Sequence, residues 1–556
     1  MDDLKKEKSN DSRETPRKQL QKQPPSASKS ELPETSREIR ASTWITLAIL
    51  GSTILITMYG ETMLLPAIRD VIRDFHISYS TASWILTAYL ISGAVMTPIA
   101  GKLSDIYGRK KLVLIILIIY IIGISIGALS DNISVLLVAR VIQGVGISMF
   151  PIAFGIIRDQ FPIEKLAIGV GVFSSMFAAG SVVGLAVGGS IIQNFGWHTT
   201  FLSIVPIAIA LWIIINRSIH EDNKAELEQK GGSLMQDAST KSDTEHDLNL
   251  HRVITSRRSI DVKGAITLAV TITSFLLTLT YIGNNGSSTS NVVASSTQIA
   301  IISLAFLSIG SLALFVLIER KASSPLIELS LIADKILLPA NIIILIFGIT
   351  MFMVYQTIPI LVRSPLPLGF GGDAVASATV QLPFMIIFLV FAPSAGFIVS
   401  RIGNLKPIIA GSFITAIGFF SLFVFHSTEF MIATNLAIIS VGLSLTQVGA
   451  FNITMQYAPR QFSGVSLGMT VVLVLIGSSI GPAIAAIYMQ TYQEIIKGVS
   501  GSFPSIISYN LIFLTAALIS TISIAFVMVL QRRMSDSISK KSESTLDGFR
   551  KGPRNS

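Results

Sequence analysis

The sequence predicts an all-α integral membrane protein: two pseudo-symmetric six-helix bundles plus two extra helices, about fourteen transmembrane helices in total. The 556 residues are 51% hydrophobic and only 13% charged, about half the charge of a typical soluble domain. Apolar stretches of about 20 residues recur, each long enough to cross a bilayer as a helix. A basic segment, Gly101–Lys111, returns in weaker form at Gly396–Lys406, which indicates one plan used twice.

The predicted spans fall near 43–68, 81–100, 112–130, 133–157, 166–192, 200–217, 263–283, 297–318, 336–361, 378–400, 406–425, 430–453, 465–490 and 506–530. They divide the chain into domains: an N-terminal bundle (43–217), a charged linker (218–262), two extra helices (263–318) and a C-terminal bundle (336–530). Residues 1–42 and 531–556 are polar and are predicted to be disordered tails.

The distribution of basic residues predicts the orientation. With both tails in the cytoplasm, the inner loops hold roughly twenty Lys and Arg. Only four lie outside: Arg69, Arg73, Arg363 and Lys497. The positive-inside rule therefore predicts a multi-pass protein of the cell membrane with both termini cytoplasmic.

Several function classes are excluded by composition. The chain has no cysteine, so it has neither disulfides nor thiolate metal sites, and its six histidines are scattered without metal-ligand spacing. No Walker-type phosphate loop is present, which argues against ATP as the energy source. The net charge of +9 lies in loops and tails and does not indicate a nucleic-acid partner. No nucleophile–base pair is visible, so we do not expect an enzyme.

The internal repeat extends beyond the basic segment, at an offset of 295 to 297 residues. Gly108 corresponds to Gly403, and the stretch Gln160–Gly184 parallels Tyr457–Gly481. Within these stretches small residues recur every four positions, at Gly180, Gly184, Gly188, and at Gly477, Gly481, Ala485. Such stripes let another helix pack closely. They are either ordinary packing surfaces or the sliding contact between the two halves.

Two ionisable residues lie well inside predicted spans, Glu61 and Arg140. Counting at 1.5 Å per residue places both about 10 Å below the outer surface, at a common depth. A carboxylate in hydrocarbon favours its protonated form, whereas a neighbouring arginine favours the charged form. We therefore expect Glu61 to carry a proton and Arg140 to tune it. The structural alternative is that Glu61 reaches the outer interface and Arg140 pairs with a carbonyl or a lipid head group.

Several motifs resemble the major facilitator superfamily, specifically its fourteen-span drug–proton antiporters. GKLSDIYGRKK resembles the loop between spans 2 and 3, and RVIQGVG at Arg140–Gly146 resembles the span 4 motif of proton-driven antiporters. GSVVGLAVGG resembles the span 5 motif, although Leu185 replaces its usual proline, and the second copy does carry Pro482. Val380–Gly403 also resembles the tenth span of this branch. One departure is Glu61, which resembles the span 1 acid of some twelve-span exporters.

The segment Gly101–Lys111 is predicted to be a gate on the cytoplasmic side. Gly101 and Gly108 would allow close approach and a tight turn. Asp105 would lie at a helix N-terminus of the other half, and Arg109 would reach Asp159. The alternative is a simple basic anchor.

A central cavity between the halves is expected to bind the substrate. Aromatic and amide side chains suit lipophilic cations. The candidates are Tyr59, Trp84, Tyr89, Phe154, Tyr355, Gln356 and Gln447.

The resemblance implies proton-coupled efflux of small amphipathic compounds by alternating access, with the proton gradient in place of a cofactor. The expected partners are a small-molecule substrate, protons and the lipid bilayer, with the protein acting as a monomer. Alternatives are export of a specific metabolite or metal–cation complex, uncoupled uniport, and a receptor without transport. A single intramembrane acid favours monovalent, zwitterionic or neutral substrates.

Overall fold

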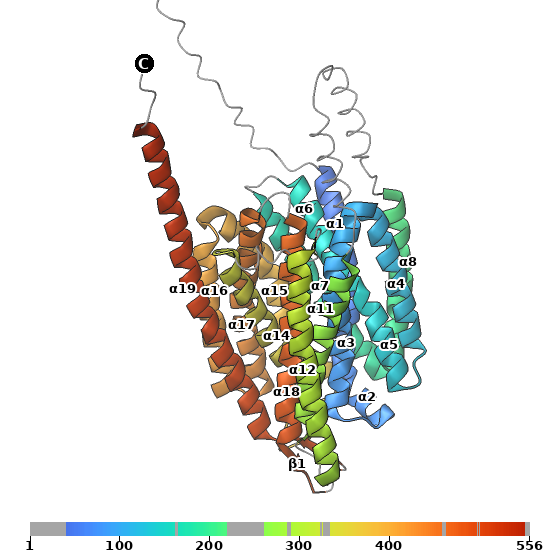
Figure 1. Ribbon diagram of the computed structural model, residues 1–556. Helices are drawn as coiled ribbons and strands as arrows, with labels where there is room; N and C mark the ends of the chain where they lie inside the picture. The colour runs from blue at the N-terminus through green and yellow to red at the C-terminus, as the bar shows by residue number, and fades with distance from the viewer. Residues whose placement is uncertain are drawn as a thin grey trace, which may run out of the picture. The chain divides into compact units, whose positions relative to one another are not determined.

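The computed structural model describes residues 41–161, 165–218, 261–285, 291–322, 325, 334–458, 463–497, 499 and 501–550. In these ranges, 14 helical segments are long and apolar enough to cross a membrane, as the sequence predicts (Figure 1). The predicted tail at residues 1–40 and linker residues 219–260 lie outside the described chain.

The elements in the first part of the chain are α1 (Ala41–Thr62), η1 (Leu65–Ala67), α2 (Ile68–Phe75), α3 (Tyr79–Tyr107), α4 (Arg109–Ala128), α5 (Ile133–Gly144), η2 (Val145–Ser148), α6 (Met149–Gln160), α7 (Leu166–Phe195) and α8 (His198–Ser218). The remaining elements are α11 (Val262–Asn285), α12 (Asn291–Lys321), α14 (Leu337–Arg363), α15 (Ala374–Ile402), α16 (Leu405–Val424), α17 (Glu429–Tyr457), α18 (Ser463–Thr491), β1 (Gln493–Ile495), β2 (Ser502–Pro504) and α19 (Ile506–Arg550).

The helices begin and end where local chemistry dictates. Ser78, Asn132, Asp373 and Thr428 each cap the helix that follows, because their side-chain oxygens accept a hydrogen bond from a main-chain N–H of the first turn. The repeat is visible in the turns: α3 ends at Gly108 with φ 93° and α15 ends at Gly403 with φ 82°. Only glycine adopts this backbone conformation easily, so both copies need it.

The two ends of the bundle are distinguished by their loops. We call the end where α1 begins and the α3–α4 turn lies the Gly108 face, and the end that carries α2 and the β1–β2 hairpin the Asp70 face (Figure 1). The antiparallel hairpin pairs Gln493 with Pro504 and was not foreseen by an all-α prediction. α19 also differs from expectation, since it continues to Arg550 where a disordered tail was predicted from residue 531. No proline, the strongest helix-breaking residue, interrupts residues 531–550.

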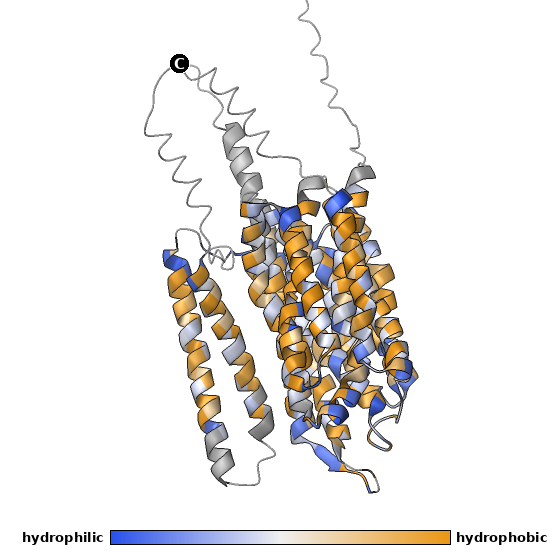
Figure 2. Cartoon of the chain, turned by 90° about the vertical axis from the view of Figure 1, so that its right-hand side faces the viewer, coloured by the Kyte–Doolittle hydropathy of each residue, from blue (hydrophilic) through white to orange (hydrophobic). Residues whose placement is uncertain are grey.

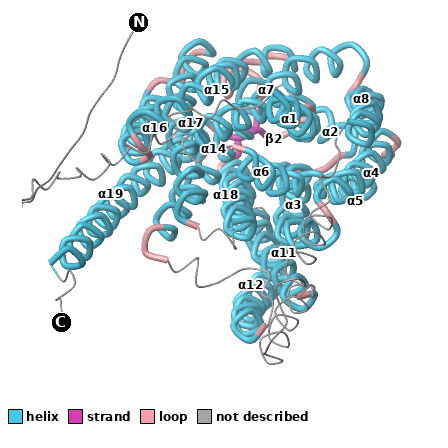
Figure 3. The backbone as a smooth tube through the Cα atoms, turned by 90° about the horizontal axis from the view of Figure 1, so that it is seen from above, coloured by secondary structure: helices cyan, strands magenta, loops and turns pink. Residues whose placement is uncertain are grey.

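Two pairs of long helices join the halves. α7 packs along α15, and α3 packs along α18. These pairs correspond to each other under the repeat, because α3 and α15 carry the two copies of the basic segment and α7 and α18 carry the two glycine stripes. Figure 3 shows the helices of both halves arranged around α1, α6, α14 and α17.

The extra helices lie beside one of these seams. α11 and α12 pack against each other, and α11 contacts both α3 and α18 (Figure 3). Hydroxyl groups connect the pair, with Thr271 Oγ1 donating to Ser311 Oγ at 3.0 Å. The remaining surface of the pair is strongly apolar (Figure 2), which suits contact with lipid.

Candidate functional site

A cavity lies where helices of both halves meet. The space in and around it, open solvent included, is about 580 Å³. Residues of α1, α3, α6, α7, α14, α17 and α18 line it together with η2. Seven phenylalanines dominate the wall: Phe150, Phe154, Phe173, Phe177, Phe347, Phe352 and Phe451. Among the described residues, Glu61 is the one charged side chain in the lining. The site is therefore an aromatic chamber with a single carboxylate.

Glu61 is on the last turn of α1. The helix ends at Thr62 because Pro66, two residues into the next element, cannot continue its hydrogen-bond pattern. The side chain is only 3% exposed, so it does not reach the interface as the structural alternative requires. Nothing in the described part of the chain forms an ion pair with its carboxylate within 4 Å.

Arg140 holds the end of α1 through main-chain carbonyls. Its Nη1 donates to Gly60 O at 2.8 Å, its Nη2 to Glu61 O at 3.4 Å, and its Nε to Ile85 O on α3 at 3.0 Å. The final carbonyls of a helix lack partners within it, and a cation there also suits the helix dipole. The structure thus brings residues 61 and 140 together. The contact, however, is to the backbone of residue 61, which is the carbonyl pairing named as the alternative for Arg140.

Two tyrosines complete this support of α1. Tyr89 lies under the guanidinium of Arg140, at 4.8 Å from ring centroid to Cζ, and its hydroxyl donates to Thr57 O at 2.9 Å. The hydroxyl of Tyr120 donates to Ile56 O at 2.7 Å. The last two turns of α1 are therefore fixed by side chains of α3, α4 and α5, and this fixes the position of Glu61 in the cavity wall.

Two of the seven predicted cavity residues line the chamber, Phe154 and Gln447. Tyr59 instead shares a hydrogen bond with Ser203 at 2.7 Å, and Tyr89 supports Arg140. Tyr355 lines a smaller pocket within the C-terminal half. Trp84 and Gln356 are absent from the chamber wall. Hydropathy cannot separate a cavity-facing aromatic residue from one that faces lipid or packs between helices, so it also missed the other phenylalanines.

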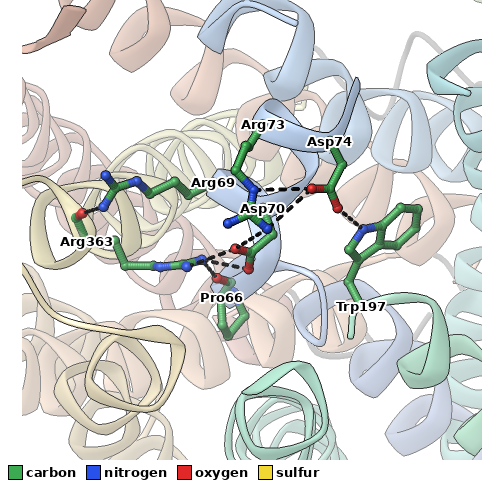
Figure 4. Close-up of polar contacts among 7 residues, drawn as sticks. All are labelled: Pro66, Arg69, Asp70, Arg73, Asp74, Trp197 and Arg363. Atoms are coloured by element: carbon green, nitrogen blue, oxygen red, sulfur yellow. Dashed lines mark hydrogen bonds and ion pairs between the residues drawn. The ribbon is translucent and has the colours of Figure 1, made fainter. Parts of the chain in front are cut away.

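An ion pair connects the halves at the Asp70 face (Figure 4). Arg363 at the end of α14 contacts Asp70 on α2 through both terminal nitrogens, each at 3.1 Å. Arg363 also donates to Pro66 O, and Arg69 donates to Arg363 O. Three of the four basic residues predicted to lie outside gather here, since Arg73 also contacts Asp70 at 3.8 Å. We call Pro66, Arg69, Asp70 and Arg363 the latch.

The predicted gate segment is only partly described. The guanidinium of Arg109 lies beside Gly155 on α6. A Cβ atom built on Gly155 would lie 3.2 Å from Arg109 Cζ. Arg109 is thus near the end of α6 that carries Asp159, but the side chains of Asp105 and Asp159 lie outside the described set. Gly101 was expected to allow close approach of another segment. No described heavy atom lies within 4 Å of a Cβ built on it, so no such approach occurs in this structure. The close approach occurs instead at its repeat partner Gly396, against Ala167 of α7.

The glycine stripes pack helices within each half. Added Cβ atoms at Gly180 and Gly184 would collide with α1, and one at Gly188 would collide with Met63 directly after it. Those at Gly477 and Gly481 would collide with α14, and Pro482 lies inside α18 next to this contact. The expectation that the stripes form the sliding contact between halves is therefore wrong. A different face of α7 makes that contact, with Gly171 beside Ala392 of α15.

The chamber wall carries few polar groups. Across the described ranges, no three His, Asp or Glu side chains gather as a metal ion would require. The polar groups of the lining are one carboxylate, two hydroxyls and one amide, from Glu61, Ser174, Ser478 and Gln447.

Comparison with known proteins gives the family. The profile of the Major Facilitator Superfamily matches residues 50–482. Multidrug resistance protein 3 of Bacillus subtilis (strain 168) is 30% identical over 355 residues, which is 64% of this chain and 61% of that protein. The tetracenomycin C resistance and export protein of Streptomyces glaucescens is 25% identical over 456 residues, 81% of this chain and 77% of that protein.

A solved structure supports the same fold. The human organic anion transporter MFSD10 (TETRAN) superposes with a TM-score of 0.58 at 11% identity, covering 88% of this chain and all of that one. The matched stretch spans about three fifths of the first bacterial relative. The 14 candidate spans agree with these matches and indicate a multi-pass membrane protein. The chain belongs to the Major Facilitator Superfamily.

Proposed function

We propose that this transporter exports small amphipathic compounds, above all lipophilic monovalent cations, in exchange for protons. The observation that carries this proposal is the single carboxylate of Glu61 in the wall of a chamber that is otherwise aromatic and apolar. The names of two relatives, one a multidrug resistance protein and one an export protein, are consistent with it.

The environment of Glu61 provides a mechanism for exchange. An ionised carboxylate without a partner is costly in an apolar wall. It is stabilised either by a proton or by a cationic substrate, and the two neutralise the same charge. Binding of a cation therefore favours loss of the proton, and binding of a proton favours release of the cation. This competition is the simplest form of antiport through one site.

The phenylalanines supply affinity without strict shape selection. Aromatic faces attract cations and stack on flat apolar rings. Phe154 of α6 and Phe451 of α17 stack across the two halves with centroids 5.3 Å apart. A flat ligand between such rings would contact both halves at once. We therefore expect substrate binding to depend on how the halves are arranged.

Alternating access requires that one end opens while the other is closed. The latch closes the Asp70 face, which the positive-inside rule assigns to the outside. Toward the Gly108 face the halves meet along α7 and α15 at Gly171 and Gly396. We propose that rocking of the halves breaks one of these contacts at a time. The segment around Arg109 would act with the second contact as the cytoplasmic gate.

Arg140 has a positioning role in this proposal. It grips the carbonyls of Gly60 and Glu61, so a change in the tilt of α1 moves Glu61 relative to the cavity. The buried cation also offers a nearby positive charge to Glu61 when the proton leaves. Arg140 thus couples proton binding to the position of α1 without forming a direct ion pair in this conformation.

The test uses purified protein in liposomes with an acidic lumen and ethidium outside. An antiporter converts proton exit into ethidium uptake, measured as fluorescence on DNA trapped in the lumen. We expect Glu61→Gln to abolish the gradient-driven part of this uptake. Glu319→Gln is the matched control, because Glu319 is also 3% exposed but lies on α12 away from the chamber. Equal uptake by the parent and Glu61→Gln would contradict proton coupling through Glu61 and favour uniport.

A further inference from the structure

Two polar groups of the chamber lack protein partners. Gln447 is 8% exposed and Ser478 is 0% exposed, and both line the chamber from the C-terminal half. Gln447 Oε1 and Ser478 Oγ are buried and have no hydrogen-bond partner among the described residues. A buried polar atom without a partner is unfavourable, and a ligand that forms a hydrogen bond with it would remove this cost.

Helix geometry aims both groups into the chamber. Gln447 lies one turn before Phe451 on α17, and Ser478 lies one turn after Val474 on α18. Residues four apart share a helix face, and Phe451 and Val474 are themselves part of the lining. The two polar groups therefore belong to the cavity-facing sides of adjacent helices. Glu61, in contrast, enters the lining from the N-terminal half.

We propose that Gln447 and Ser478 form a hydrogen-bonding subsite that recognises an N–H or O–H group of the substrate. This inference rests on the proposed export of amphipathic cations and narrows the substrate class. The preferred substrate is a monovalent cation with a flat aromatic system and a hydrogen-bond donor. The amide oxygen of Gln447 accepts from this donor, and the hydroxyl of Ser478 accepts or donates beside it.

The placement of the subsite also links binding to movement. A substrate that neutralises Glu61 and bonds to Gln447 is held by both halves of the transporter at once. Its binding energy then differs between arrangements of the halves, which is the condition for a ligand to shift a conformational equilibrium. A cation without a donor lacks the second of these contacts.

Two cations of the same charge separate this proposal from simple packing. Ethidium carries two aromatic amino groups, whereas tetraphenylphosphonium has no hydrogen-bond donor. We would measure the affinity of the purified protein for both cations, and their transport in liposomes, for the parent, Gln447→Leu and Ser478→Ala. Gln381→Leu and Ser466→Ala are matched controls, since these residues are also 0% exposed with an unpartnered side-chain oxygen but do not line the chamber.

If the subsite exists, Gln447→Leu weakens ethidium binding about tenfold, which is the contribution of one hydrogen bond to a charged or polarised donor. The affinity for tetraphenylphosphonium should stay within about twofold of the parent value. Ser478→Ala should act in the same direction with a smaller effect, and the controls should change neither ligand. Equal losses for both cations, or no change for ethidium, would overturn the subsite while leaving the export proposal intact. A parent protein that binds and moves neither cation would instead overturn the export proposal, and the subsite with it.

Discussion

Arg363 and Asp70 form a two-pronged ion pair that joins the last turn of α14 to the first turn of α2, with both N–O distances at 3.1 Å (Figure 4). The residues are 293 positions apart and belong to different halves of the chain. Arg363 is thus attached to the other half by its side chain, and its main-chain carbonyl accepts a hydrogen bond from Arg69. Opening of the Asp70 face requires all of these contacts to break.

Removal of the latch should expose the chamber from the Asp70 face. We expect Arg363→Ala to shift the equilibrium toward the open form by about 1 kcal/mol or more, which is about a fivefold change in the ratio of the two forms. Because the chain has no cysteine, Ser174→Cys gives a single thiol in the chamber wall. Its rate of reaction with a membrane-impermeant thiol reagent, applied to cells or right-side-out vesicles, reports this opening.

Arg73→Ala is the control for the latch. Arg73 is 75% exposed, and within the described chain its ion pairs are with Asp70 and Asp74 of its own half. Its loss should leave the labelling rate unchanged. A labelling rate that does not rise in Arg363→Ala would show that the ion pair does not limit opening.

The hydrogen bonds of Arg140 predict that a positive charge alone at this position does not maintain stability and transport. A lysine at this position keeps the charge but cannot reach the carbonyls of Gly60, Glu61 and Ile85 together, because it lacks the planar fork of arginine. We expect Arg140→Lys to lower the Tm of the detergent-solubilised protein by several degrees and to reduce ethidium transport strongly. Arg401→Lys, at an exposed position, should change neither. Normal stability and transport in Arg140→Lys would refute the positioning role.

Substitution by alanine should affect stability differently at a closely packed glycine, Gly184, and at a glycine with open space around it, Gly101. At Gly184 an added Cβ would lie 2.9 Å from Tyr59 O, so Gly184→Ala must push α7 away from α1, at a cost of about 1–3 kcal/mol. At Gly101 the space is open and the residue lies inside α3, so Gly101→Ala should stabilise the helix by about 0.5–1 kcal/mol. Thermal unfolding of the two variants would compare them directly. Equal destabilisation would mean that another conformation brings a helix close to Gly101.

The aromatic wall should determine affinity for flat cations. We expect Phe154→Leu to weaken binding of the flat cation ethidium about threefold to tenfold, because the cation–π contact is lost while the apolar surface remains. Phe201→Leu is the control, since Phe201 is fully buried against Gly127 within the N-terminal half and does not line the chamber. Equilibrium binding to the purified variants measures both effects. Similar losses in the two variants would indicate a general packing defect.

Much of the fold could be predicted because the membrane imposes simple rules. Each span is a long apolar stretch, and the repeat is visible in glycines such as Gly108 and Gly403, which share a backbone conformation that other residues avoid. The depth argument also placed Glu61 beside Arg140, since the rise of a helix is constant. These inferences depend on local sequence or on distance along one helix.

The missed features depend on which way a helix face points. The Asp70–Arg363 pair joins residues far apart in the chain, and charge counting placed Arg363 at the outer side without naming a partner for it. Phe150 and Phe347 line the chamber, but a phenylalanine that faces lipid has the same hydropathy. Likewise, spacing alone showed that Gly180 and Gly477 lie on smooth stripes and could not show that each stripe packs within its own half.

The most direct test of the account is whether a bound cation displaces a proton from Glu61. Purified protein in weakly buffered detergent solution would be titrated with tetraphenylphosphonium over a series of pH values, with proton release followed by a pH-sensitive dye. The account predicts that release approaches one proton per bound cation in the parent and in Glu319→Gln, and that it disappears in Glu61→Gln. Cation binding without proton release in the parent, or undiminished release in Glu61→Gln, would contradict the account.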